Sequence, residues 1–390
     1  MTERMRLMLA VTSGAVTMAE ACRQAGVSRK TGYKWRARFV AEGAAGLRAR
    51  ARAPRRRPQT VPAVVREAVL TQRARHPTWG PKKLVAALRE EQPGVRWPAP
   101  STAGDLLKRA GLVVPRRWRR RAPPRTEPLA HATAPNVVWC ADFKGDFRLG
   151  DGTRCYPLTI SDARSRFLLR CQALPATDTG RVQPLFAATF REYGLPDVLR
   201  TDNGPPFASV GLAGLTALGV WWIKLGITPE RITPGKPAEN GRHERMHRTR
   251  KADACAPAAA TPRAQQAAFD RFRAEYNTVR PHEALGQRPP ATVYQRSPRP
   301  FPDRLAELTY PAADAVRWVR PNGAIRWHQA ELYLSAALGG EPVGLSQVGD
   351  GRWQVAFGPL VLGTFHQQTP ILQPHRPSRH RAARAPTATA

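Results

Sequence analysis

The sequence predicts a multidomain fold, with all-α units at the N-terminus, a mixed α/β sheet in the centre and a small β-barrel at the C-terminus. Three observations support this prediction. Helical periodicity dominates up to about residue 114, strand patterns alternate with helices from residue 135, and short strands separated by turns follow residue 303. At 390 residues, the chain is long enough to form several separate cores.

Residues 1–50 have the pattern of helices joined by a glycine-containing turn. A short helix over 18–25 ends at Gly26, and Ser28 is a favourable N-cap for a second, basic helix. This order is typical of a helix-turn-helix, whose second helix enters the major groove of DNA; an ordinary basic hairpin is the alternative. The DNA-binding residues expected on this helix are Arg29, Lys30, Lys34 and Arg36.

A second helical unit is expected over residues 59–114, with helices at 63–75, 81–91 and 101–110. The last two helices again resemble a helix-turn-helix. A basic linker over 115–134 follows, which we expect to tether the unit and to lie along DNA phosphates. Its expected phosphate contacts are Arg116, Arg117, Arg119 and Arg120.

The central domain is predicted over residues 135–295. Three strands come first, and helices then alternate with strands, which is the order of a mixed α/β sandwich. The expected strands are 137–149, 154–161, 167–173, 198–201 and 220–223. The expected helices are 178–193, 210–218, one that starts at Asn240, and 262–277.

The C-terminal part is predicted to form a small antiparallel barrel over residues 303–370. Its short, regularly spaced strands alternate apolar and polar residues between turns. Residues 371–390 have the composition of a disordered basic tail.

The charge of the chain predicts a polyanionic partner. Lys and Arg number 62 against 29 Asp and Glu, which gives a net charge of +33. No apolar run approaches the roughly 18 residues of a membrane span, so a membrane role is not expected. Five scattered cysteines without a C-x-x-C pair argue against a disulfide framework, and the reducing cytoplasm fits best.

Three acidic residues stand in short motifs within this basic chain. Asp142 lies in W-C-A-D-F-K, Asp202 in R-T-D-N-G and Glu244 in N-G-R-H-E-R. A carboxylate cluster in a cationic protein can hold a divalent metal where a phosphodiester is delivered, while the basic surface holds the rest of the nucleic acid.

The ordered set W-x-x-D, T-D-N-G, N-G-x-x-E and N-x-x-R-P-H resembles bacterial insertion-sequence transposases of the DDE class, which have a retroviral-integrase-type, RNase H-like catalytic core. The resemblance covers nearly the whole chain. It implies that Asp142, Asp202 and Glu244 are the catalytic residues and the ligands of two Mg²⁺ ions, for which Mn²⁺ substitutes. It also implies double-stranded DNA partners, namely terminal inverted repeats and target DNA, and a homo-oligomer located at the nucleoid.

The third carboxylate has a rival. The spacing from Asp202 to Glu244 is longer than is usual in the family, and Glu239 would fit that spacing better. Glu244 is preferred because it stands in the N-G-x-x-E motif on a helix, whereas Glu239 precedes that helix beside a proline. Arg248 and Lys251 follow one and two helical turns later and are expected to contact DNA.

Two other functions fit parts of the sequence. Residues 243–247 match H-E-x-x-H, the motif of zinc peptidases, but no third zinc ligand follows in sequence and residues 248–251 are basic. A catalytically inactive DNA-binding regulator derived from a transposase is the second alternative. The presence of all three carboxylates argues against it.

Overall fold

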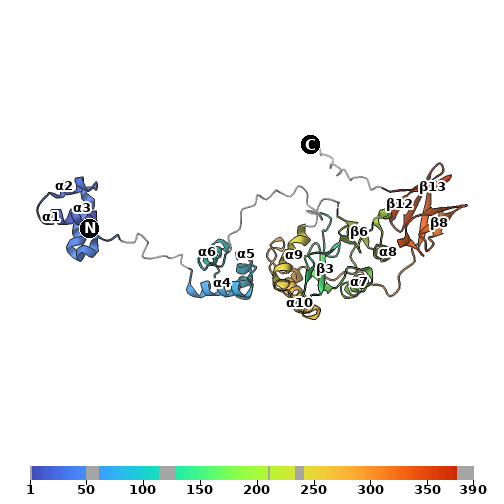
Figure 1. Cartoon of the computed structure of the whole chain (residues 1–390), viewed down its shortest axis with the longest axis horizontal. Coiled ribbons are helices and arrows are strands. Elements are labelled where there is room, and N and C mark those ends of the chain that lie inside the picture. Colours follow the sequence, from blue (N-terminus) through green and yellow to red (C-terminus); the bar gives the residue numbers. More distant parts are fainter. Residues whose placement is uncertain (1, 50–60, 114–128, 210, 233–240, 376–390) are drawn as a thin grey trace. The chain divides into compact units, whose positions relative to one another are not determined.

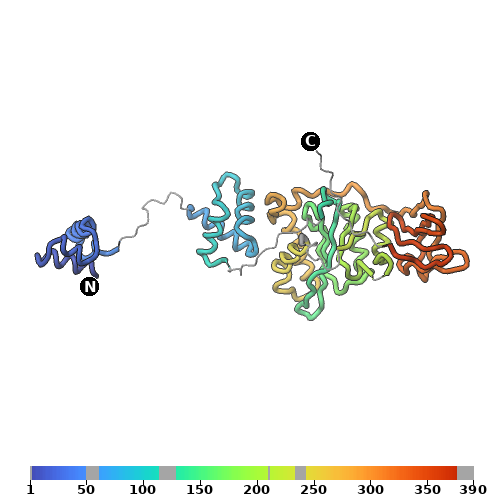
Figure 2. Tube along the Cα trace, turned by 90° about the horizontal axis from the view of Figure 1, so that it is seen from above, coloured from blue at the N-terminus to red at the C-terminus, as the bar shows by residue number. Residues whose placement is uncertain are grey.

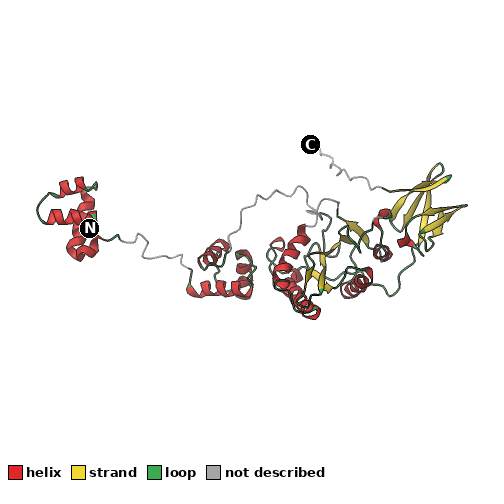
Figure 3. Cartoon of the chain, in the orientation of Figure 1, coloured by secondary structure: helices red, strands yellow, loops and turns green. Residues whose placement is uncertain are grey.

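The computed structural model describes residues 2–49, 61–113, 129–209, 211–232 and 241–375. The chain divides into two compact units, Met1–Pro62 and Ala63–Ala390. Figure 1 labels the helices and strands along the chain, and Figure 2 gives the same trace from above. Strands are confined to the second unit, whereas the described part of the first is entirely helical (Figure 3). In the described segments, no helix is both long and apolar enough to cross a membrane.

The first unit confirms the expected helix-turn-helix order. Helices α1 (Glu3–Thr12), α2 (Met18–Gln24) and α3 (Arg29–Glu42) are followed by a 3₁₀ turn, Gly43–Leu47. The Ser28 hydroxyl accepts a hydrogen bond from the Thr31 N–H and caps α3. A Cβ at Gly32 would lie 2.3 Å from the Cys22 sulfur, so glycine is what allows α3 to approach α2 this closely.

The second unit begins with three helices: α4 (Ala63–Arg75), α5 (Pro81–Glu91) and α6 (Pro100–Arg109). They agree closely with the predicted ranges. Pro81 and Pro100 occupy the first turns of α5 and α6, where a missing N–H costs nothing. The side chains that fill the space between the helices are apolar and buried: Val69, Trp79, Leu84, Leu88, Ala103 and Leu107.

The centre of the second unit is a six-stranded mixed sheet. Its strands are β1 (Val138–Phe143), β2 (Phe147–Arg148), β3 (Arg154–Asp162), β4 (Leu168–Leu174), β5 (Val198–Thr201) and β6 (Thr228–Arg231). The order is β2-β3-β1-β5-β6, with β4 paired to β3. The first three long strands are antiparallel, whereas β5 and β6 are parallel to β1.

Helices cover both faces of this sheet. Helices α7 (Thr179–Tyr193) and α8 (Ala217–Lys224) pack on the face that carries Trp139 and Ala141. Helices α9 (Gly241–Ala254) and α10 (Pro262–Thr278) pack through Met246, Phe269, Phe272 and Tyr276 on the other face. The alternation of side chains along β1 therefore directs Asp142 toward the α9 face.

Three sequence predictions in this region were wrong. Residues 220–223 are helical rather than a strand, and β6 was not expected. Of the helix predicted over 210–218, the described residues before α8 contain only the short 3₁₀ turn Leu212–Gly214. Helix α8 packs against the central core through Trp222 and against the C-terminal core through Val220 and Ile223. A helix buried on two sides has no amphipathic period, so its short apolar run resembles a strand.

The C-terminal part forms an open sheet, so the predicted barrel was wrong. A five-stranded sheet has the order β13-β12-β11-β10-β7, a separate hairpin consists of β8 and β9, and neither described sheet closes on itself. The strands are β7 (Ala315–Trp318), β8 (Ala324–Trp327), β9 (Ala330–Tyr333), β10 (Pro342–Gly349), β11 (Arg352–Phe357), β12 (Leu360–His366) and β13 (Thr369–Pro374).

Packing explains why closure is unnecessary. The apolar residues of the sheet, among them Val343 and Leu345, form one cluster with Val220 and Ile223 of α8. Helix α8 and the β8–β9 hairpin, through Ile325 and Trp327, thus bury the sheet without its closing on itself. The disordered tail was predicted from residue 371, whereas residues 369–374 form β13 and pair with β12. Residues 376–390 lie outside the described residues.

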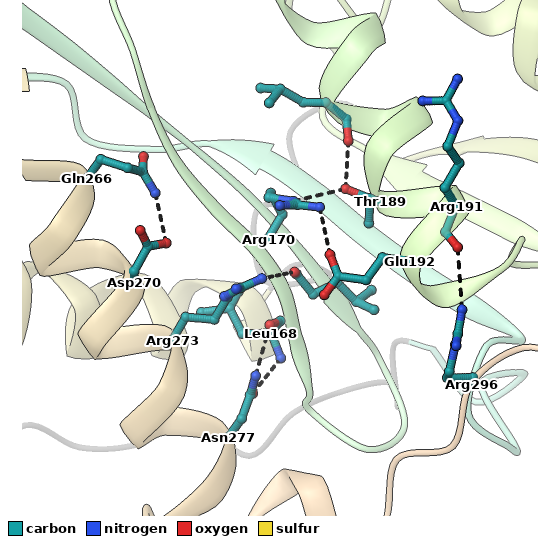
Figure 4. Close-up of polar contacts among 12 residues, drawn as sticks. Leu168, Arg170, Thr189, Arg191, Glu192, Gln266, Asp270, Arg273, Asn277 and Arg296 are labelled. Carbon is teal, nitrogen blue, oxygen red and sulfur yellow. Dashed lines mark hydrogen bonds and ion pairs between the residues drawn. The ribbon is translucent and has the colours of Figure 1, made fainter. Parts of the chain in front are cut away.

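Side chains of α10 cover the edge strand β4 (Figure 4). The Asn277 amide accepts a hydrogen bond from the Leu168 N–H and donates one to the Leu168 carbonyl oxygen, at 2.8 and 3.0 Å. The Arg273 guanidinium donates to the Leu169 carbonyl oxygen, and Gln266 bonds the backbone of β4 near its end. These side chains satisfy edge groups that a neighbouring strand would otherwise pair.

We therefore expect Asn277→Ala to destabilise the protein. It would leave the buried backbone groups of Leu168 without partners, at a cost of about 2–4 kcal/mol for the pair. Urea unfolding of the full chain measures this loss. Asn203→Ala is the control, because the Asn203 amide makes one exposed bond to the Ile232 carbonyl oxygen. Equal stability of Asn277→Ala and the unmodified chain would contradict the proposed role of Asn277.

Candidate active site

Asp142 and Asp202 lie at corresponding positions near the carboxyl ends of two neighbouring strands. Strands β1 and β5 are parallel, and Ala141 is in register with Thr201, so the next residue of each chain segment is an aspartate. Asp142 is 3% exposed at the end of β1. Asp202 follows β5, and its Oδ1 accepts a hydrogen bond from the Gly204 N–H at 3.2 Å. The carboxyl ends of parallel strands are where α/β sheets place functional groups.

Glu244 comes to the same place from the first turn of α9. Its carboxylate is half-buried and lies 3.5 Å from the Lys144 Nζ. Lys144 stands two residues after Asp142, and the negative charge of Glu244 acts on the Asp142 carboxyl. Arg248 and Lys251, four and seven residues after Glu244, are exposed on α9. The helix therefore presents an acidic end followed by cations along one face.

Two histidines of α9 face the sheet behind Asp142. The imidazole nitrogens of His243 lie 2.9 Å from the Thr159 hydroxyl and 3.1 Å from the Ser161 hydroxyl. The His247 Nε2 lies 3.3 Å from the Asp142 Oδ2. Burial lowers the pKa of both histidines to about 3, so both imidazoles are neutral at neutral pH.

Asp142 and Asp202 hold their protons more tightly than usual. Burial raises the pKa of Asp142, and the negative charge of Glu244 adds to the effect, while His243 and Lys144 oppose it. Burial also raises the pKa of Asp202, and the charge of Asp142 is the next cause. Crowded carboxylates that repel one another are a donor set suited to a hard divalent cation, which takes oxygen ligands and relieves the repulsion.

Sequence reasoning missed two cations of the site. Lys144 could have been found, because it stands two positions after Asp142 and so projects from the same side of the chain. Arg250 is 2% exposed and donates to the Lys144 carbonyl oxygen at 2.6 Å, while its guanidinium also lies 5.5 Å from the Phe269 ring. No sequence signal separates this buried arginine from the exposed Arg248 and Lys251 beside it.

The other predicted DNA contacts lie apart from the carboxylates in the sequence. All four predicted contacts on α3 of the first unit are exposed: Arg29, Lys30, Lys34 and Arg36. Arg116, Arg117, Arg119 and Arg120, and the rival Glu239, lie outside the described residues.

Comparison with known protein families gives matches over most of the described chain. Residues 132–237 and 225–290 match the Integrase core domain family, in two separate profiles. Residues 3–58 match a Helix-turn-helix domain, and residues 31–107 a Homeodomain-like domain. Residues 132–290 are therefore similar to an integrase core. The matched spans include Asp142, Asp202 and Glu244.

Two curated relatives come from insertion elements. A 31.7 kDa protein of insertion element IS407 from Burkholderia multivorans is 32% identical over 195 residues, which cover 48% of this chain and 65% of the relative. A 39.2 kDa protein of IS476 from Xanthomonas euvesicatoria is 30% identical over 220 residues, which cover 55% and 60%. The chain thus spans less than two thirds of the length of either relative. These matches support the resemblance to insertion-sequence transposases with an integrase core.

Among solved structures, the integrase-core chain is similar to the catalytic core domain of HTLV-2 integrase, whose structure is in complex with magnesium. The two are 14% identical, the match covers 42% of this chain and 99% of that chain, and the TM-score is 0.33.

Proposed function

We propose that this integrase-core chain is a transposase that binds the terminal inverted repeats of its element, cleaves DNA there and joins the freed end to target DNA. The observation that supports this best is the meeting of three carboxylates from β1, the end of β5 and α9 at one edge of the sheet. A basic surround with a net charge of +33 favours a polyanionic substrate at that edge.

In this proposal Asp142, Asp202 and Glu244 bind two Mg²⁺ ions, and Mn²⁺ can replace Mg²⁺. Bound ions of this kind supply positive charge that activates an attacking oxygen and stabilises the leaving oxygen of an in-line phosphoryl displacement. The register of β1 with β5 brings Asp142 and Asp202 to corresponding positions on neighbouring strands, which favours their binding the ions together. Lys144, beside Glu244, offers a further positive charge to a phosphate oxygen.

Cleavage and joining use the same residues. In cleavage, water attacks phosphorus, and the bond from phosphorus to the 3′-oxygen breaks and leaves a 3′-hydroxyl. In joining, that 3′-hydroxyl attacks a target phosphodiester, so one P–O bond forms and one breaks. Arg248 and Lys251, exposed along α9, hold the DNA backbone beside the acidic end of the helix.

The partners and location follow from the same proposal. Duplex DNA from the element ends is bound by the helix-turn-helix units, with Arg29, Lys30, Lys34 and Arg36 on the recognition helix and Arg116, Arg117, Arg119 and Arg120 along phosphates. Two ends must be brought together for joining, which requires a homo-oligomer. Such a protein acts at the nucleoid, in the cytoplasm.

The test of the third carboxylate is Glu244→Gln. On a duplex that contains an element end, with Mg²⁺ or Mn²⁺, it should lose cleavage and joining by at least about a hundredfold, because one ligand charge is removed. Glu239→Gln is the matched control and should stay active. An active Glu244→Gln with a dead Glu239→Gln would assign the role to Glu239. A fully inactive unmodified chain that still binds DNA would favour the inactive regulator instead.

A further inference from the structure

The buried face of the candidate active site contains a second group of possible metal ligands. One nitrogen of His243, one nitrogen of His247 and one carboxylate oxygen of Asp142 lie within 4.8 Å of one another. All three side chains are buried, with residue exposures of 3%, 5% and 3%. The group combines the i and i+4 positions of α9 with the end of β1, so neighbouring elements fix it.

The ring nitrogens of His247 provide independent support for a binding site here. Neither of its ring nitrogens has a hydrogen-bond partner among the described residues, although both are buried. A buried polar atom without a partner is costly, and such groups call for an explanation. The Asp142 Oδ2 is 3.3 Å from the His247 Nε2, yet the two do not form a hydrogen bond of good geometry.

His243 is supported in the way that metal-binding histidines usually are. Its two nitrogens contact the hydroxyls of Thr159 and Ser161, so that whichever nitrogen bound a metal, the other would keep a hydroxyl partner. Ligating imidazoles almost always use their second ring nitrogen in this way, which fixes ring orientation.

We propose that Asp142, His243 and His247 form a binding site for Zn²⁺ and similar transition-metal ions, separate from the carboxylate set but sharing Asp142 with it. Imidazole suits Zn²⁺, whereas Mg²⁺ prefers oxygen ligands. Tetrahedral zinc with bonds of about 2.0–2.1 Å holds its ligand atoms about 3.4 Å apart. The pair formed by Asp142 and His247 already has this separation, and the third atom needs a small shift.

The shared aspartate makes this an inhibitory site. An Asp142 oxygen that binds Zn²⁺ against the histidines is withdrawn from Asp202 and Glu244, so Zn²⁺ should oppose the Mg²⁺-dependent reaction; this half of the inference rests on the proposed function. The site is not that of a peptidase, because its three side chains are buried and leave no room for a peptide. The nearby charges of Arg250 and Lys144 make the expected affinity lower than that of a structural zinc finger.

The proposed metal binding is tested with Co²⁺, because the visible absorption of this ion depends on its ligands and coordination number. The full-length chain without other metal should bind one Co²⁺ with the strong absorption of a low-coordinate nitrogen and oxygen site. His247→Gln and His243→Gln should each weaken this binding by at least about tenfold. His375→Gln, an exposed histidine outside the group, is the matched control and should bind as the unmodified chain does. Thermal unfolding shows that each variant is folded.

The outcomes separate the two proposals. Loss of Co²⁺ binding in both histidine variants, with Zn²⁺ inhibition of Mg²⁺-dependent cleavage relieved at least about tenfold in them, supports the whole inference. Co²⁺ binding that depends on the histidines without any cleavage activity would sink the transposase proposal and leave the metal site. Absence of Co²⁺ binding, or binding equal in the unmodified chain and in both folded variants, would overturn the metal site whatever the cleavage assay shows.

Discussion

Asp142→Asn and Asp202→Asn should each reduce DNA cleavage and joining by at least about a thousandfold, equivalent to about 4 kcal/mol of barrier. Each change removes one of the two adjacent carboxylates at the ends of β1 and β5 and keeps the shape of the side chain. Affinity for duplex DNA should remain, because the helix-turn-helix units belong to other parts of the chain. Gel-based cleavage and joining assays with a matched binding assay measure both effects.

The same substitution at Asp142 should stabilise the metal-free protein. Burial raises the pKa of the Asp142 carboxyl, so its charged form costs stability. That cost is absent below the unfolded pKa and fully present once the pH exceeds the raised pKa of the folded state. At neutral pH, Asp142→Asn should therefore have a higher Tm than the unmodified chain, and added Mg²⁺ should raise the Tm of the unmodified chain more.

Asp146→Asn is the control for both readouts. Asp146 is an exposed carboxylate that pairs with Arg154 at 2.6 Å, a few residues beyond Asp142. It should cleave, join and unfold as the unmodified chain does. If Asp142→Asn cleaved DNA as well as Asp146→Asn, the carboxylate site would be wrong, and the unchanged shape of the side chain would rule out a packing explanation.

The position of Asp202 at the end of a strand could be predicted, because the end of that strand can be recognised in the sequence. A buried strand followed directly by Asp202-Asn203-Gly204 marks the point where β5 stops. Asp142 was expected in the middle of a strand over 137–149, whereas β1 ends at Phe143 and β2 begins at Phe147. Once the strands are parallel neighbours, their ends coincide without further information. The helices of residues 1–110 were equally accessible, because caps and helical periods are local.

Features that depend on packing between two sheets could not be predicted from the sequence. Helix α8 contains Val220 and Trp222, residues that favour strands, and it is helical because it fills the space between the central sheet and the C-terminal sheet. Because α8 also packs against the C-terminal sheet, that sheet does not need to close into a barrel. Nothing within the short apolar run indicates a second sheet beyond it, so local propensity pointed to a strand.

The grouping of His243 and His247 with Asp142 could not be predicted for a different reason. The H-E-x-x-H match lacks a third ligand after His247 along the helix. The structure supplies a carboxylate from β1 instead, at Asp142, far earlier in the chain. Spacing rules find ligands on one element, whereas a ligand contributed by a neighbouring strand becomes visible only when the register of the sheet and the face of α9 are known.

The recognition helix α3 is where DNA affinity should be most sensitive to single side chains. Arg29, Lys30 and Lys34 are exposed near its start, which the Ser28 cap fixes. The helix is held against α2 at Gly32. In a helix-turn-helix, the N-terminal residues of the second helix contact base edges in the major groove. These three cations are therefore expected to reach both bases and phosphates.

The triple change Arg29→Ala, Lys30→Ala and Lys34→Ala should weaken binding to an element-end duplex by about a hundredfold or more, since a good base contact contributes about 1–3 kcal/mol. The dependence of affinity on salt should fall by about one unit of slope for each phosphate that the protein no longer neutralises. Helix content should not fall, because alanine is the strongest helix former and all three side chains are exposed.

Arg6→Ala separates recognition from simple loss of charge. Arg6 is exposed on α1 of the same unit rather than on α3, and its replacement should change affinity by less than about threefold. Titrations of end-containing and scrambled duplexes, at several salt concentrations, distinguish the cases. If the triple variant lost affinity equally for both duplexes, α3 would supply charge without recognition. Arg6→Ala removes one positive charge, and the triple variant removes three. If the loss of affinity for each charge removed were the same in both, the specific role of α3 would be refuted. The total positive charge of the unit would then explain its affinity for DNA.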